Sequence, residues 1–128
     1  KKLSKNITNY LSVLDKTYFK NRITQKDSCV FVALSKNKII GYLCGGLIKP
    51  NICRGSLPSA ELENTFILPE YRSLGLGSAL YKKFYNWCKK NKVKRIIVHA
   101  YTKNEKGINF YQKNHFNNLS SILEAKVK

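Results

Sequence analysis

The sequence predicts a mixed α/β fold, an α+β arrangement in which helices cover the faces of a central β-sheet, and three observations support it. Residues 29–35 and 39–48 are rich in β-forming residues and flank a Lys-Asn-Lys turn, which predicts a hairpin. Residues 60–90 read as a strand, a glycine loop and an amphipathic helix, and another strand and helix follow. This order predicts a parallel crossover around residues 60–101. A chain of 128 residues is long enough for one domain with a real core.

The first half of the chain predicts a helix and then the hairpin. Apolar residues recur at helical spacing over residues 6–20, namely Ile7, Tyr10, Leu11, Leu14 and Tyr18. The hairpin strands are Cys29–Ser35 and Ile39–Ile48. The second strand contains Gly41, Gly45 and Gly46, which predict bulges or the close approach of another backbone. A loop over residues 49–59 follows, and we expect this loop and residues 1–28 to shape any substrate pocket.

The second half predicts two helices and three strands. Residues 60–68 form the third strand, and a helix begins near Leu76 with an apolar face and lysines outside. Next come a strand over Lys94–Tyr101, a helix over Asn104–Asn114 and a final strand over Phe116–Val127. The expected order is therefore α-β-β-β-α-β-α-β. Strand alternation would bury or half-bury His99, which we interpret as structural.

Composition restricts the class of protein. The net charge of +17 is compatible with a polyanionic partner such as RNA, but lysines occur along the whole chain, which favours solvated surfaces. The four cysteines form no Cys-x-x-Cys pair, so we expect reduced thiols, no metal site and a cytoplasmic location. No apolar run reaches the length of a membrane span, and no signal-peptide pattern is present.

Residues Arg72–Gly77 read Arg-Ser-Leu-Gly-Leu-Gly and lie between the third strand and its helix. The first N–H groups of a helix have no internal partner and the helix dipole adds positive potential, so this loop predicts an anion site. Gly75 and Gly77 remove side chains that would hold a phosphate away. A Walker loop would end in Gly-Lys-Ser/Thr, and a dinucleotide fingerprint would need a small residue where Leu80 stands. Both of these nucleotide-binding classes are therefore disfavoured.

Two segments in register match motifs of one enzyme family. The first is Arg-x-x-Gly-x-Gly, preceded by Leu-Pro-Glu-Tyr, and the second is Asn104–Phe116, which follows the pattern Asn-x-x-Ala-x-x-Phe-Tyr-x-x-x-Gly-Phe. The chain thus resembles the GNAT superfamily of N-acetyltransferases over about residues 29–127. Gly107 replaces the usual Ala, and His115 replaces the usual Gly at a left-handed turn that His tolerates. The resemblance implies one domain over residues 1–128 with a splayed, GNAT-type sheet. A family domain usually starts with a strand and a helix, but residues 1–28 offer only the helix, so we expect the first strand to be absent.

The resemblance also implies acetyl-CoA as co-substrate and an amine acceptor on a small molecule or a protein. Transfer would be direct, within a ternary complex. Backbone groups of the third strand would hold the pantetheine arm, the glycine loop would hold the pyrophosphate, and Asn104 and Tyr111 would approach the arm and the sulfur. The implied cofactor-binding residues are Phe66, Ile67, Leu68, Arg72, Ser73, Leu74, Gly75, Leu76, Gly77, Ser78, Asn104 and Tyr111.

Three side chains are candidates for the chemistry. An alkyl ammonium has a pKa of ~10.4, so its deprotonation at pH 7 costs ~4–5 kcal/mol, and a carboxylate can take that proton. Glu61 and Glu63 lie two apart on the third strand, so alternation places both on one face. The resemblance implies that one is the base, and Glu63 is slightly favoured over Glu61. It also implies that Tyr111 protonates the leaving thiolate, although a surface role for the acids and core packing for Tyr111 remain alternatives.

Two other functions stay open at this stage. One is a coenzyme A-binding regulator without catalysis, against which the presence of Tyr111, Glu61 and Glu63 argues. The other is a basic RNA- or ribosome-associated protein that uses the glycine loop for a backbone phosphate. No membrane partner is expected, and a homodimer is left open.

Overall fold

The computed structural model describes residues 25–49 and 57–128, and all structural statements below concern these residues. The helix expected over residues 6–20 and most of the loop over residues 49–59 lie outside the described residues. The expected absence of the family's first strand lies outside them as well.

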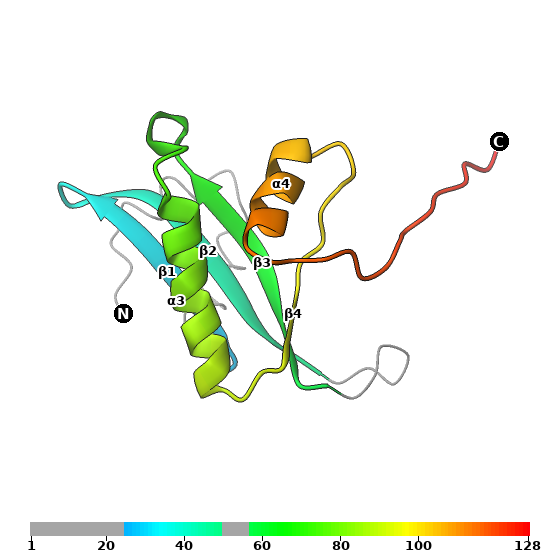
Figure 1. Ribbon diagram of the computed structural model, residues 1–128, viewed down its shortest axis with the longest axis horizontal. Helices are drawn as coiled ribbons and strands as arrows, with labels where there is room; N and C mark the ends of the chain where they lie inside the picture. Colours follow the sequence, from blue (N-terminus) through cyan, green and yellow to red (C-terminus); the bar gives the residue numbers. More distant parts are fainter. Residues whose placement is uncertain (1–24, 50–56) are drawn as a thin grey trace.

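The described chain forms a sheet with helices against it (Figure 1). From the hairpin to the helix over residues 105–113, the order of strands and helices follows the expected one. A short 3-10 helix, which the sequence interpretation treated as a turn, precedes the glycine loop. The elements are β1 (Ser28–Ser35), β2 (Lys38–Ile48), β3 (Ser59–Ile67), η3 (Pro69–Tyr71), α3 (Leu76–Lys90), β4 (Arg95–Ile97) and α4 (Glu105–Lys113).

The sheet has the order β1-β2-β3-β4, with antiparallel pairing up to β3 and parallel pairing between β3 and β4. The expected mixed sheet and its parallel crossover are therefore confirmed. The register between β2 and β3 shifts between Cys44 and Gly45, where Leu62 and Asn64 pair but Glu63 is left over, so β3 carries a bulge. A Cβ on Gly45 would lie 2.5 Å from the Glu61 carbonyl oxygen and 2.6 Å from Phe84 Cε1, which confirms the expected close approach.

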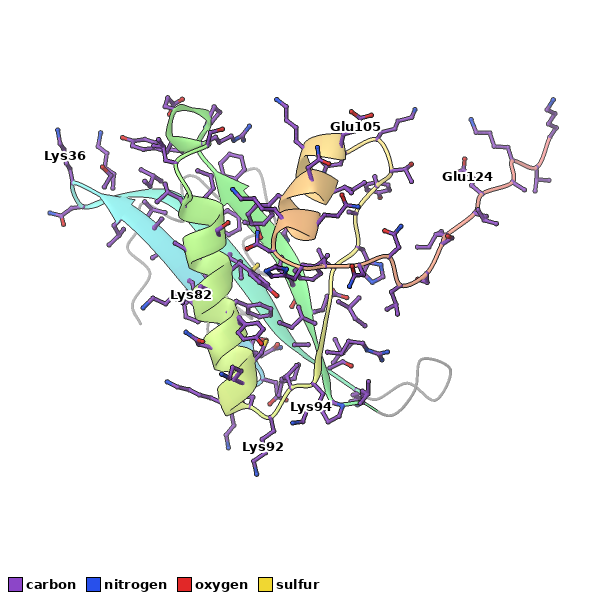
Figure 2. The ribbon with its side chains drawn as sticks, viewed as in Figure 1. Lys36, Lys82, Lys92, Lys94, Glu105 and Glu124 are labelled. Carbon is purple, nitrogen blue, oxygen red and sulfur yellow. The ribbon has the colours of Figure 1, made fainter. Side chains whose placement is uncertain are left out.

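Apolar side chains pack on both faces of the sheet. One face meets α3, where Leu43, Ala60 and Leu62 pack with Leu80, Phe84 and Cys88 of the helix. The other face carries Ile39, Tyr42 and Cys44, with Val30 and Val32 of β1 beside them. The apolar stripe of α3 thus faces the sheet as its spacing predicts, and its lysines lie outside. Figure 2 shows Lys82 on this outer side, with Lys92 and Lys94 after the helix.

Two strand predictions and one burial prediction are wrong. β4 spans only Arg95–Ile97 instead of Lys94–Tyr101, because β3 pairs with it only through Ser59, Ala60 and Glu61 before the two strands diverge. His99 lies beyond the paired part and is therefore exposed rather than buried, with 51% of its side-chain surface accessible. The segment 116–128 forms no strand, and it pairs with none of the four described strands.

The ends of α4 agree with the sequence interpretation. The Asn104 side chain accepts a hydrogen bond of 3.1 Å from the Gly107 N–H and caps the first turn. After Lys113, His115 adopts a φ of 72°, the left-handed turn expected where the family motif has Gly. The N–H of Phe116 then donates to the Tyr111 carbonyl at 3.0 Å, which closes the helix end.

Candidate functional site

The glycine loop presents backbone amides at the start of α3. Gly75 is the N-cap residue with a φ of 84°, and no side chain caps this end of the helix. Ser73 also has a positive φ, 63°, and left-handed residues in a loop can turn successive N–H groups to one side, as in anion-binding nests. No acidic residue lies in the first turn. The N-terminus of α3 therefore has no side-chain cap and no acidic residue in its first turn, and a helix N-terminus of this kind can hold an anion.

Arg72 braces this loop against the end of β3. Its Nε donates a 2.8 Å hydrogen bond to the Ile67 carbonyl, and its guanidinium carbon lies 5.5 Å from the centre of the Phe66 ring. The sequence interpretation assigned Arg72 to the anion itself. In the structure the Nε–H holds the loop against the end of β3, and the assignment of the guanidinium to the anion stays a prediction.

Gly77 allows α4 to approach the first turn of α3. A Cβ on Gly77 would lie 2.9 Å from Cε1 of Phe110, closer than real Cβ contacts come. The second link between the two helices is the Asn114 side chain, whose Nδ2 donates to the Ser78 hydroxyl at 3.3 Å. The two motifs, which 26 residues separate in the sequence, are thus packed together at one end of the sheet.

Beyond Glu61, β3 has an open edge. β4 pairs with Ser59, Ala60 and Glu61 only, so among the described residues no strand pairs with the β4-facing side of β3 from Leu62 to Ile67. Figure 1 shows β3 and the chain after β4 separating toward the end where α4 and the glycine loop lie. This fork is the splayed sheet that the sequence interpretation expected.

The strand residues predicted to bind a cofactor arm line the end of this edge. The Ile67 carbonyl accepts from Arg72, and the Leu68 N–H donates to the Ile40 carbonyl at 2.8 Å, so both of these groups already have a partner. The ring of Phe66 lies on the sheet face turned away from α3, 6.2 Å from the centre of the Tyr42 ring. The backbone from Leu62 to Phe66 is therefore the better-placed part of the strand for a bound chain.

Glu61 and Glu63 lie on the sheet face that is turned away from α3. Ala60 and Leu62 point toward α3, so the intervening Glu61 points away from it. Gly46 is the cross-strand partner of Glu61, and a Cβ there would lie 3.5 Å from Oε1 of Glu63. Both carboxylates therefore lie over the same face, as the strand alternation predicts.

His99 joins this pair, which the sequence interpretation missed. Its Nε2 lies 3.6 Å from Oε1 of Glu61, where β3 and β4 begin to diverge. The parallel register explains the contact, because Glu61 pairs with Ile97 and His99 lies two residues further on the same face. The register between β3 and β4 cannot be read from the sequence, and only that register reveals the pair.

Tyr111 lies on the other face, with the helices. It packs against the cluster that contains Leu43, Leu62 and Phe84, and its ring lies 5.4 Å from Phe110 and 5.5 Å from Phe116. Burial raises the pKa of the Tyr111 hydroxyl above its usual value, so the group stays protonated at neutral pH and can act as a proton donor. The structure thus separates the two kinds of candidate: carboxylates on one face of the fork and the phenol on the other.

Asn104 occupies the helix-cap position that the sequence interpretation allowed. A Cβ on Gly107 would meet the Asn104 side chain at 2.4 Å, so the glycine leaves room for this cap. The described residues contain no group of three or more His, Cys, Asp or Glu side chains placed to hold a metal ion. No helix in the described ranges is long and apolar enough to cross a membrane.

Comparison with known proteins identifies the fold and the family. The family model for the acetyltransferase (GNAT) family matches residues 4–116. No curated protein matches the sequence significantly.

Several solved structures share the fold at low sequence identity. An aminoglycoside 6'-N-acetyltransferase from Acinetobacter haemolyticus superimposes with a TM-score of 0.82 and 16% identity over 100% of this chain and 97% of its own. An aminoglycoside N-acetyltransferase in complex with CoA superimposes with a TM-score of 0.80 and 18% sequence identity, and the match covers 98% of this chain and 96% of that protein. A mutant of a Bacillus halodurans protein superimposes with a TM-score of 0.81 and 16% sequence identity, and the match covers 94% of this chain and 84% of that protein.

Proposed function

Because this chain belongs to the GNAT acetyltransferase family, which uses acetyl-CoA as co-substrate, we propose that it moves an acetyl group from acetyl-CoA to an amine by direct transfer in a ternary complex. The observation that carries the proposal is the fork between β3 and β4, with a helix N-terminus at its open end.

The fork and the loop match two parts of the co-substrate. The pyrophosphate would lie on the amides from Leu74 to Ser78, where charge-assisted hydrogen bonds are worth ~1.5–3 kcal/mol each. The pantetheine arm carries amides and would pair like an added strand with the open edge of β3. The loop and the edge are contiguous along the chain through Arg72, so one extended ligand can span both.

The two faces of the fork support direct transfer. The carboxylates lie on the face turned away from α3, and Tyr111 packs on the α3 face. An acceptor approaching from the carboxylate side and a thioester held from the helix side would meet at the fork without passing each other. Both reactants can then be bound together, so no acyl-enzyme intermediate is required.

We assign the base to Glu63 and keep Glu61 as the second candidate. Glu63 lies past the last β3 residue that pairs with β4, on the stretch where the thioester would lie, whereas Glu61 lies at the closed end of the fork beside His99. The carboxylate takes a proton from the acceptor ammonium, the neutral amine attacks the thioester carbonyl, and the C–S bond breaks. The Tyr111 hydroxyl then protonates the departing thiolate, and the second proton released by the attacking nitrogen as the amide forms restores the hydroxyl.

The acceptor is an amine on a small molecule or a protein. Aminoglycosides belong in a test panel because several solved relatives of this fold are aminoglycoside acetyltransferases. The net charge of +17 with only seven acidic residues disfavours a polycationic acceptor, however. We therefore expect acceptors that present a single amine, such as a peptide N-terminus, to react better than an aminoglycoside such as sisomicin.

The test combines cofactor binding with turnover. Calorimetry should detect coenzyme A binding by the folded chain, and release of free thiol from acetyl-CoA should depend on an added amine. Glu63→Gln and Glu61→Gln are matched variants: we expect the first to lower turnover more, with coenzyme A affinity unchanged in both. No coenzyme A binding by a folded sample would refute the proposal.

Two outcomes would favour the alternatives. Tight coenzyme A binding without turnover on any acceptor would favour a non-catalytic regulator. Salt-dependent RNA affinity without heat-stabilisation by acetyl-CoA would favour a nucleic-acid-binding protein.

A further inference from the structure

Two carboxylates lie on one face of the fork, and in the proposed reaction only the one nearer the thioester can deliver an amine to it. Glu61 and Glu63 are two residues apart on β3, which is ~6.6 Å along an extended chain. Reacting atoms must come within about 3–3.5 Å of each other. An acceptor ammonium held by the wrong carboxylate would therefore bind without reacting, and it would keep a second acceptor molecule away from the right one.

The chain at the end of β4 brings an imidazole to Glu61. Ile97 is the strand partner of Glu61 and is buried, so this end of β4 is fixed in the core. Val98 packs against the apolar cluster that the sheet forms with α3, and alternation turns His99 to the opposite face, where the acids lie. The Nε2 atom of His99 lies 3.6 Å from Oε1 of Glu61, which is ion-pair distance when the imidazole is protonated.

The neighbours of Glu61 leave this position to His99. On the β2 side, the strand partner of Glu61 is Gly46, which has no side chain. Among the described residues, His99 is the only cationic side chain within ion-pair distance of the Glu61 carboxylate. The side chain of His99 is 51% exposed and that of Glu61 is 33% exposed, so the pair is open to solvent on the face that an acceptor would approach.

The Glu61–His99 contact affects ligand binding more than folding stability. An ion pair between exposed groups adds little to stability, because water and salt screen both charges. A carboxylate that already has a cation beside it attracts a second cation less strongly, since the two cations repel each other. A neutral imidazole acts in the same sense, because its ring occupies the space beside Oε1 that an ammonium would need.

We propose that His99 is a positioning residue that shields Glu61 and so directs the acceptor ammonium to Glu63. This inference rests on the proposed function, with Glu63 as the base. The shielded carboxylate lies at the closed end of the fork, where β3 and β4 are still paired. The acceptor is thereby guided ~6.6 Å further along β3, to the open stretch where the thioester would lie.

Steady-state kinetics with butylamine, a probe that carries a single amine, tests the shield. His99→Ala should let the butylammonium ion bind at Glu61 without reacting. Binding of this kind lowers kcat and KM by the same factor and leaves kcat/KM unchanged. We expect both constants to fall about threefold, which is about 0.7 kcal/mol and the size of an exposed ion pair. His99→Lys keeps a cation at this position, so both constants should fall less than in His99→Ala.

A double-mutant cycle identifies the carboxylate involved. In a Glu61→Gln background, His99→Ala should leave kcat and KM where Glu61→Gln alone puts them, because the competing carboxylate is already gone. An NMR titration with butylammonium, without coenzyme A, gives a second measurement that needs no turnover. His99→Ala should bind butylammonium about threefold more tightly than the parent, and Glu61→Gln should abolish this gain.

Three outcomes would overturn the inference. One is a fall in kcat with KM unchanged, which would place His99 in the chemistry itself. The others are unchanged kinetics and butylammonium affinity in His99→Ala, and an equal effect of His99→Ala with and without the Glu61 carboxylate. Circular dichroism checks folding, and His99→Gln replaces the alanine variant if that variant does not fold. Absence of amine-dependent turnover in the parent would refute the proposed function instead, and the butylammonium titration would still decide whether His99 shields Glu61.

Discussion

Gly77→Ala tests the contact that joins the two motifs. The new Cβ would lie 2.9 Å from Cε1 and 3.2 Å from Cζ of Phe110, so the ring or α4 must move. Overpacking of this kind costs ~1–3 kcal/mol, and Ala in place of Gly returns ~1 kcal/mol of helix propensity. We therefore expect a net loss of about 1 kcal/mol in the free energy of unfolding, or about 4 °C in Tm for a domain of this size.

Chemical denaturation of a double-mutant cycle measures this coupling. Phe110→Leu should relieve the clash, so the pair of substitutions should cost about 1 kcal/mol less than the sum of the two single changes. Coenzyme A affinity of the double variant then separates two roles of the glycine. If the double variant recovers coenzyme A affinity, Gly77 serves the packing of α4. If the affinity stays low, the glycine is needed to let a phosphate approach the loop. A Gly77→Ala protein as stable as the parent would refute the steric reasoning.

Three further predictions concern single side chains. Tyr111→Phe should lower turnover by about 10²-fold and leave coenzyme A affinity unchanged by calorimetry, since only the proton donor is lost; weakened binding would contradict the assigned role. Burial raises the pKa of Cys88 from 9.0 to about 12, so the unfolded thiol ionises first and stability should fall from about pH 9 upward by at most ~1.4 kcal/mol per pH unit for this group. Denaturation of Cys88→Ala should show a correspondingly shallower alkaline loss, and an unchanged slope would refute this. The Thr65 hydroxyl is buried without a hydrogen-bond partner among the described residues, so Thr65→Val should raise the unfolding free energy by about 1 kcal/mol, and a destabilised variant would show that the hydroxyl has a use.

The sequence predicts local structure well where one residue dominates the outcome. The left-handed turn at His115, the cap at Asn104 and the close approach at Gly45 each follow from a residue type at a defined place. The order of elements from the hairpin to α4 is likewise confirmed, because strand and helix periodicities differ clearly there.

The errors arise where structure depends on a partner strand. The stretch around His99 has the composition of a strand, but strand length is set by the ladder with β3, which ends at Ile97. The 116–128 segment was expected to form a strand, but it pairs with none of the described strands. The Glu61–His99 contact depends on the same register, so periodicity within one segment could not reveal it.

The extra residue in β3 changes which positions of that strand serve the core. Before it, even-numbered residues such as Ala60 and Leu62 pack under α3, whereas after it the odd-numbered Ile67 does so. An uninterrupted strand would have turned Ile67 to the same side as the two acids and away from the apolar cluster that the sheet forms with α3. The one extra residue thus reverses which side of β3 faces α3. The same strand can therefore hold both carboxylates on the face away from α3 at one end and pack an apolar side chain on the α3 side at the other.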